Sequence, residues 1–368
     1  MYKKQTSPKL LQAELLPTQE EQVPANPNPP PRNRQLDSDD DAEPRTKRAR
    51  TTRPTSEPAR LTRKNLALFN KMVNPKKTST HRDSDDMPTT KSLSSTSSGF
   101  CMRVYENGIL NPFNSKPPTN LQEIYTRLAR RRATASPPKS DYRSYTNNVG
   151  KAGNEATIVV ETSEKLLKKY NDDDGYNRAY NRPFTGLPKD AGFNNGLSAP
   201  QPDFVEGLGM HEYRPFPVEK HISGAVLYKD DCHSVTLPHI AGEWKGPDGR
   251  MADATLQSSY DGAALVYARN QARKYSGKSD PAGYAHVTTF TTNGAQLNFY
   301  AHYAAPSEDG ALEYHQYRVK TINLTGSYQE YKEGRKYLRN EQDHAREQSY
   351  ELKDELKEHY KKQRGSGL

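Results

Sequence analysis

Asp203, Glu243 and Lys245 are the residues of this chain whose types and spacing best suit a chemical role. Asp203 follows a proline, and forty residues later Glu243 and Lys245 flank Trp244 in a Glu-Trp-Lys tripeptide. Side chains alternate between the two faces of a β-strand. A strand at this tripeptide would therefore place the Glu243 carboxylate and the Lys245 ammonium side by side.

Such a trio suits the hydrolysis of a phosphodiester bond. The negative charge of the diester repels hydroxide, so hydrolysis needs a hard cation on the phosphate and a water of lowered pKa beside it. Mg²⁺ takes oxygen ligands and few protein carboxylates, and water and phosphate complete its shell. Asp203 and Glu243 would hold Mg²⁺ or Mn²⁺, and Lys245 would orient the attacking water or balance the developing charge.

The same residues have a plainer interpretation. Pro-Asp is common in turns, and Glu-x-Lys is frequent on exposed strands, where the two side chains form a solvated ion pair contributing roughly 0 to 1 kcal/mol. A short motif is confirmed by its structural context. The elements around the trio therefore decide between the two interpretations.

These elements are expected to alternate between helix and strand. Apolar residues recur at helical spacing over residues 154–170 and 253–273. Asn293-Gly294 is a strong hairpin signal, so the strands on either side of it should pair antiparallel. Strand patterns are found at residues 202–205, 235–244, 285–290, 295–303 and 314–324.

The order helix, strand with Asp203, strand with Glu243 and Lys245, helix, strand resembles the PD-(D/E)xK nuclease superfamily over roughly residues 154–300. The resemblance implies an α/β fold of the restriction-endonuclease type, in which helices flank a mixed β-sheet. It also implies that Asp203 and Glu243 are the metal carboxylates and that Lys245 is the catalytic lysine.

The resemblance implies two further site residues. Glu161, on the helix before the strands, matches the acidic metal ligand that many members supply from their first helix. Gln257 matches the helical glutamine of the RecB-like branch, where Gln-x-x-x-Tyr follows the lysine. The tyrosine of this chain is Tyr260, one position short of that pattern.

A wider stretch of the chain resembles a domain of fungal proteins whose role is uncharacterised. This likeness implies a lineage and not a reaction. It is carried by Gly192-Phe193-Asn194-Asn195-Gly196-Leu197-Ser198, Gly242-Glu243-Trp244-Lys245 and Tyr300-Ala301-His302-Tyr303.

Composition separates a basic tail from a folded part. Only 32% of the 368 residues are hydrophobic, which is too polar for globular structure throughout. Residues 1–150 contain 26 Lys and Arg against 15 Asp and Glu, a net +11, whereas residues 151–368 contain 28 against 30, a net −2. We expect a disordered basic tail (1–100), a linker with a short basic helix (101–140), the α/β domain (141–325) and a long C-terminal helix belonging to or packing on the domain (326–368).

The tail contains a basic cluster, Lys47, Arg48 and Arg50, of the kind that nuclear import receptors bind. A merely solvated basic stretch is the alternative. We expect a nuclear location, because an enzyme acting on nucleic acid would need this address. A short apolar stripe at residues 66–73 predicts one helix within the tail.

A second short helix is expected over residues 119–132. Thr119 and Gln122 are spaced as a capping box, and three arginines at residues 130–132 suit the negative end of the helix dipole. The helix could dock on the folded part or bind phosphate, or its arginines could simply complement the helix end. The long C-terminal helix begins with a similar box, Ser327 and Glu330.

Several classes of protein are disfavoured. Cys101 and Cys232 lack the spacing of a disulfide framework or a zinc site, which favours a reducing compartment. No apolar run is long enough to span a bilayer, and no signal-peptide pattern follows Met1, so we expect a soluble intracellular protein. Gly-x-Ser-x-Gly, Walker and Rossmann patterns are absent, and the histidines lack metal-site spacing.

Three functions therefore remain in view. The first is a nuclear, metal-dependent nuclease acting on DNA or RNA. The second is a nuclease fold that binds nucleic acid or protein without catalysis. The third is a scaffold that self-associates through the C-terminal helix, whose apolar stripe is thin.

Overall fold

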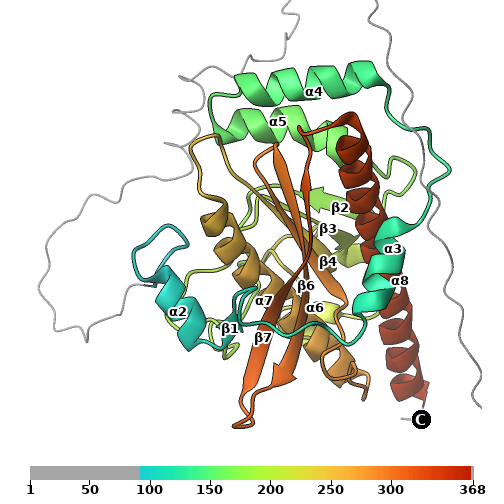
Figure 1. Cartoon of the computed structure of the whole chain (residues 1–368). Coiled ribbons are helices and arrows are strands. Elements are labelled where there is room, and N and C mark those ends of the chain that lie inside the picture. Colours follow the sequence, from blue (N-terminus) through green and yellow to red (C-terminus); the bar gives the residue numbers. More distant parts are fainter. Residues whose placement is uncertain (1–91, 366–368) are drawn as a thin grey trace, which may run out of the picture. The chain divides into compact units, whose positions relative to one another are not determined.

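The computed structural model describes residues 92–365 (Figure 1). The helix expected over residues 66–73 and the basic cluster at Lys47, Arg48 and Arg50 lie outside the described residues. A seven-stranded mixed sheet with helices on both faces forms the centre, and a long helix ends the described chain. The α/β fold class is confirmed.

The sheet has the order β1-β7-β6-β5-β4-β3-β2. β4 runs parallel to β5 and β1 runs parallel to β7, whereas the other neighbours are antiparallel. The antiparallel pairing expected around Asn293-Gly294 is confirmed by β5 and β6. The strands are β1 (Ile109–Leu110), β2 (Tyr176–Ala179), β3 (Phe204–Gly209), β4 (Val235–Trp244), β5 (Val287–Thr292), β6 (Gln296–Pro306) and β7 (Leu312–Asn323).

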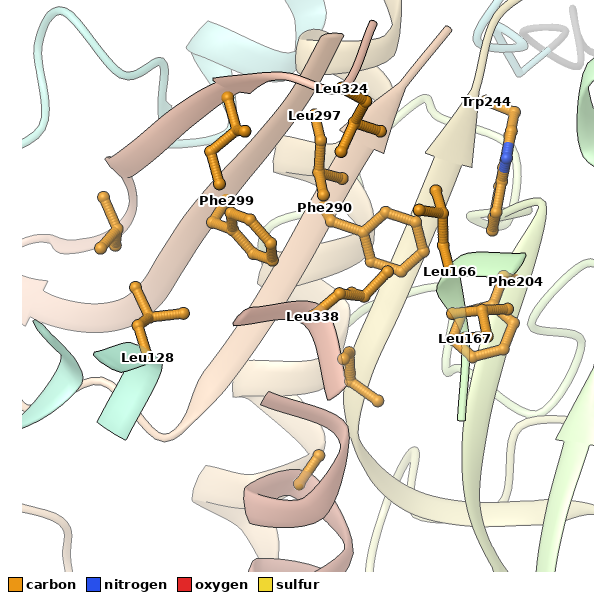
Figure 2. Packing of buried hydrophobic residues seen from close by; sticks show 14 of the residues in the cluster. Leu128, Leu166, Leu167, Phe204, Trp244, Phe290, Leu297, Phe299, Leu324 and Leu338 are labelled. Atoms are coloured by element: carbon orange, nitrogen blue, oxygen red, sulfur yellow. The ribbon is translucent and has the colours of Figure 1, made fainter. Parts of the chain in front are cut away.

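Two long helices, α7 (Met251–Tyr275) and α8 (Tyr328–Gly365), cover opposite faces of the sheet (Figure 1). Figure 2 shows the core on the α8 face, where the rings of Phe204 (β3), Trp244 (β4) and Phe290 (β5) contact one another and Leu338 of α8 lies near Phe290. Trp244 belongs to this face, and alternation along β4 places Glu243 on the opposite face, beneath α7.

The α7 helix lies close to the sheet because its inward residues are small. A Cβ built on Gly262 would come within 2.1 Å of the Nδ1 atom of His302, a buried residue of β6. α7 connects the parallel strands β4 and β5, and so it passes directly over the end of β4 that carries Glu243.

The sheet extends further toward the N-terminus than the expected domain start at residue 141. Within the stretch expected as a linker, α2 (Phe100–Glu106) and β1 lead into the sheet, and β1 pairs with β7. The helix expected over 119–132 is α3 (Leu121–Ala129), which lies against α8 (Figure 1). Arg127 of α3 forms a bidentate pair with Glu341 of α8 at 2.9 and 3.0 Å.

The prediction of a capping box at Thr119 and Gln122 is wrong. The N-cap of α3 is Asn120, and its side chain does not cap the helix. Asn120 instead accepts from the Ala285 N–H at 3.0 Å and donates to the Ala285 carbonyl at 2.9 Å. A tertiary contact has therefore displaced the local motif.

The cap of α8 is as expected, because the Glu330 N–H donates to Ser327 Oγ at 3.1 Å. The thin stripe of α8, with Tyr331, Leu338 and Leu356, is buried within the molecule. No helix within residues 92–365 is both long and apolar enough to cross a membrane. The remaining helices are α4 (Lys139–Lys151), α5 (Glu155–Leu166), η1 (Met210–Tyr213) and α6 (Val218–His221).

Candidate functional site

The pairing of β3 with β4 brings Asp203 next to Glu243. Phe204, the first residue of β3, is in register with Gly242 of β4, so Asp203 stands opposite the end of β4. The Asp203 Oδ2 atom accepts a hydrogen bond from the Trp244 N–H at 2.7 Å. The backbone of the Glu-Trp-Lys tripeptide therefore holds the Asp203 carboxylate in place.

Lys245 lies between two carboxylates. Its Nζ atom is 3.6 Å from Glu243 Oε2 and 3.6 Å from Glu155 Oε2, and it donates to the Trp244 carbonyl at 2.9 Å. Asp203, Glu243 and Lys245 thus converge on one place in the fold. Lys245 is 12% exposed and Glu243 is 3% exposed, so this pair is not of the solvated surface kind, whereas the partner Glu155 is 46% exposed.

A third carboxylate, Asp261, reaches the site from α7. Asp261 and Glu243 are each 2% exposed and interact directly. Asp261 is four residues after Gln257, where the nuclease pattern has its tyrosine. The sequence analysis missed it, although residues four apart share one face of a helix.

Burial raises the pKa of all three carboxyl groups of the site. Burial raises the pKa of Glu243 well above its usual range, and the charges of Asp261 and Asp203 raise it further. Burial also raises the pKa of Asp261 to about 7. Burial raises the pKa of Asp203 as well, while the Trp244 N–H and the Lys245 charge act to lower it. Near neutral pH the group therefore retains a proton, which Glu243 shares with Asp261.

Apart from the proton that the two groups share, Glu243 Oε1 and Asp261 Oδ2 have no hydrogen-bond donor among residues 92–365, and both oxygens are buried. A buried charge left in this state is costly, and a bound cation would compensate it. Hard carboxylate oxygens are the ligands that Mg²⁺ and Mn²⁺ prefer. Within the described residues no group of three or more His, Cys, Asp or Glu side chains could hold a metal ion. An ion held by Asp203 and Glu243 would also have to displace the shared proton.

Glu155, and not Glu161, is the acidic residue of α5 beside Lys245. Asn154 caps α5 by accepting from the Thr157 N–H at 2.9 Å, which fixes Glu155 in the first turn. Glu161 instead accepts from Asn148 Nδ2 at 2.5 Å and joins α5 to α4. The Asn154 cap, visible in the sequence, is the signal that could have drawn attention to Glu155.

Gln257 and Tyr260 lie on the flank of the site. Gln257 Nε2 donates to Ser95 Oγ at 3.2 Å, while its Oε1 atom is buried without a partner among the described residues. The Tyr260 hydroxyl donates to the Ser198 carbonyl at 2.8 Å, and its ring packs in the core on the α7 face. Gln257 is therefore one turn from Asp261, and Tyr260 is a core residue.

A row of polar side chains continues from Glu243 across the sheet. Glu243 is in register with Thr291 of β5, Thr291 with Asn298 of β6, and Asn298 with Thr321 of β7. Asn298 donates to Thr291 Oγ1 at 3.0 Å and accepts from Thr321 Oγ1 at 2.8 Å. The sheet beneath this end of α7 is therefore polar over four strands.

Comparison with models of protein families, with curated proteins and with solved structures finds no match for this chain.

Proposed function

We propose that this protein is a metal-dependent nuclease that hydrolyses phosphodiester bonds of DNA or RNA in the nucleus, by chemistry of the PD-(D/E)xK type. One observation carries the proposal. Asp203, Glu243 and Lys245 meet at the ends of adjacent strands, with a buried carboxyl oxygen of Glu243 left unpaired. The order α5, β3, β4, α7, β5 supports it, with β2 added before β3 and the short helices η1 and α6 added before β4.

Each residue has a role that follows from its contacts. Asp203 and Glu243 would hold Mg²⁺ or Mn²⁺, with Asp261 as a third carboxylate behind them. The bound ion would supply charge stabilisation at the phosphate and a water of lowered pKa. Lys245 would position the water or balance charge on the phosphate, and Glu155 would orient the Lys245 ammonium from the solvent side.

The basic tail would supply much of the affinity for nucleic acid. Affinity for phosphates comes largely from Lys and Arg residues that release counterions. Residues 1–91 contain 18 Lys and Arg against 12 Asp and Glu. Lys47, Arg48 and Arg50 within this tail would also bind a nuclear import receptor.

A second function, binding of nucleic acid or protein without catalysis, is favoured by the burial of the site. Glu243 and Asp261 are each 2% exposed. Five surface cavities found in residues 92–365 are lined by residues other than Asp203, Glu243 and Lys245. Catalysis would need the site to open, and the 46% exposed Glu155 marks the side nearest to solvent.

Cleavage assays on the full chain separate the two functions. Labelled single- and double-stranded DNA and RNA are incubated with magnesium, with manganese or with chelator. We expect metal-dependent cleavage that is lost in Asp203→Asn and Lys245→Ala but retained in Lys320→Ala, which removes an exposed lysine of β7.

Full activity in Lys245→Ala would refute the assignment of the site. Absence of cleavage by the unchanged chain, with nucleic-acid binding retained, would establish the non-catalytic function instead. Circular dichroism of each variant checks that a loss of cleavage is not a loss of fold.

A further inference from the structure

A cavity lined by basic side chains lies where α8 begins, away from the carboxylate site. Its volume is about 250 Å³, and its walls come from the loop after α3 and from the first turns of α8. Six of its lining residues are cationic and one is acidic, a net charge of +5. They are Arg131, Arg132, Lys332, Arg335, Lys336, Arg339 and Glu333.

Most of these cations lack a carboxylate partner. Arg132 pairs with Asp343 at 2.6 Å and also donates to Asn340 Oδ1 at 2.8 Å. No salt bridge within residues 92–365 involves any of the other five cations. Glu333 accepts a hydrogen bond from Gln329 at 2.9 Å. Five of the six cations therefore form no ion pair within residues 92–365, although Asp141 and Asp343 act at longer range on Arg335 and Arg339.

Two of the arginines are fixed by the end of α5. Arg335 Nε donates to the Lys165 carbonyl at 2.8 Å, and Arg339 donates to the carbonyls of Leu166 and Leu167 at 3.0 and 2.9 Å. These bonds leave both terminal nitrogens of Arg335 without a hydrogen bond in the described part of the chain. The donors are thus held in place and available to a ligand.

The arginines repel one another. Burial and the neighbouring charges of Arg335 and Arg132 lower the pKa of Arg339 to about 10, and the pKa of Arg335 is lowered as well, mainly by burial. The Arg132 Nε atom is buried without a hydrogen-bond partner among residues 92–365. Like charges held together in this way are stabilised when an anion binds between them.

We propose that this cavity binds phosphate groups, either of a free diphosphate-type anion or of adjacent phosphates in a nucleic-acid strand. Arginine presents a planar fork of donors that matches phosphate oxygens. Arg131 and Arg132, in the loop after α3, both line the cavity, and Arg132 also joins this loop to α8 through Asp343. The inference does not depend on catalysis by Asp203, Glu243 and Lys245.

The test uses the full chain, inorganic pyrophosphate as the probe, and calorimetry. The double variant Arg131→Gln, Lys336→Gln removes two cations that form no hydrogen bond or salt bridge within the described residues. The control Lys320→Gln, Arg364→Gln removes the same residue types elsewhere. We expect the first variant to lose about tenfold or more in affinity, because two charge-assisted contacts are lost. The control should change by about twofold or less.

Two results would overturn the proposal: no saturable pyrophosphate binding by the unchanged chain, or equal losses in the two double variants.

An additional titration with an oligonucleotide distinguishes the two sources of phosphate. If the ligand is nucleic acid, oligonucleotide affinity falls in the first variant and pyrophosphate competes with the oligonucleotide. If it is a free anion, only pyrophosphate affinity falls. Asp203→Asn should bind pyrophosphate normally, so failure of the nuclease proposal would leave this one intact.

Discussion

Asp261 is one of three carboxyl groups whose raised pKa makes the stability of the fold depend on pH. Its pKa is about 7 in the folded protein, whereas an unfolded aspartate has a pKa of about 3.9. Between these values the folded state binds more protons than the unfolded state, so the free energy of unfolding falls as pH rises through this window. The site alone therefore destabilises the protein at neutral and alkaline pH.

We predict that Asp261→Asn, in the presence of chelator, raises the free energy of unfolding at pH 8 by about 1 to 3 kcal/mol. The gain should shrink to a few tenths of a kcal/mol near pH 4, where the folded carboxyl group is protonated and the unfolded one is only about half ionised. Urea unfolding from pH 4 to 8 measures this, with the exposed Asp248→Asn as the control. A gain that is the same at every pH would contradict the prediction.

At the residue scale, the sequence predicts which side chains lie together when they belong to one strand. Strand alternation and adjacency predicted that Glu243 and Lys245 lie together, and they do. Glu155 and Glu161 are six residues apart on one helix, which turns about 100° per residue, so they are roughly 120° apart around its axis. The sequence does not show which side of α5 faces β4, and Asp261 depends in the same way on the rotation of α7.

At the element scale, patterns repeated along one segment were reliable and isolated motifs were not. Apolar alternation and the Asn-Gly turn predicted β4, β5 and β6, and the Ser327–Glu330 box marked the start of α8. The box at Thr119 failed because Asn120 binds Ala285, which is far away in the sequence. A rule based on neighbouring residues cannot predict a contact with so distant a residue.

The close packing of α7 on the sheet gives an element-scale prediction. Gly262→Ala should lower the free energy of unfolding by about 2 kcal/mol or more, since the new methyl group would meet the buried His302 ring and force the helix off β6. Gly150→Ala, in α4, places its methyl group in open space and should stabilise by roughly 0.5 to 1 kcal/mol. Thermal unfolding of both variants measures the contrast. Equal shifts would show that α7 can move away without cost.

At the scale of the whole molecule, the residues before 141 complete the folded part. Glu341 is 1% exposed, and its charge is compensated by Arg127 and by a hydrogen bond from Thr288 at 2.8 Å. Removing one partner of a buried ion pair typically costs about 3 to 5 kcal/mol. A chain beginning at residue 141 would lose Arg127 together with β1.

We therefore predict that residues 141–368 alone unfold at a lower urea concentration than residues 92–368, or do not fold cooperatively. Circular dichroism during urea titration compares the two chains. Glu341→Gln in the shorter chain should recover part of the loss, because it removes the unpaired buried charge. Identical midpoints for the two chains would mean that α3 and β1 add nothing to stability.

The uneven charge of the chain predicts how it would bind nucleic acid. Residues 1–91 have a net charge of +6 (18 against 12), and residues 92–368 have +3 (36 against 33). Each phosphate neutralised by Lys or Arg steepens the fall of affinity with salt. Removing residues 1–91 should therefore weaken oligonucleotide binding and make the plot of log affinity against log salt shallower, as measured by fluorescence anisotropy.

Pyrophosphate affinity of the shortened chain should be unchanged, because the basic cavity at the start of α8 is retained. Coincident slopes with and without residues 1–91 would place all phosphate contacts in residues 92–368 and assign the tail no part in binding.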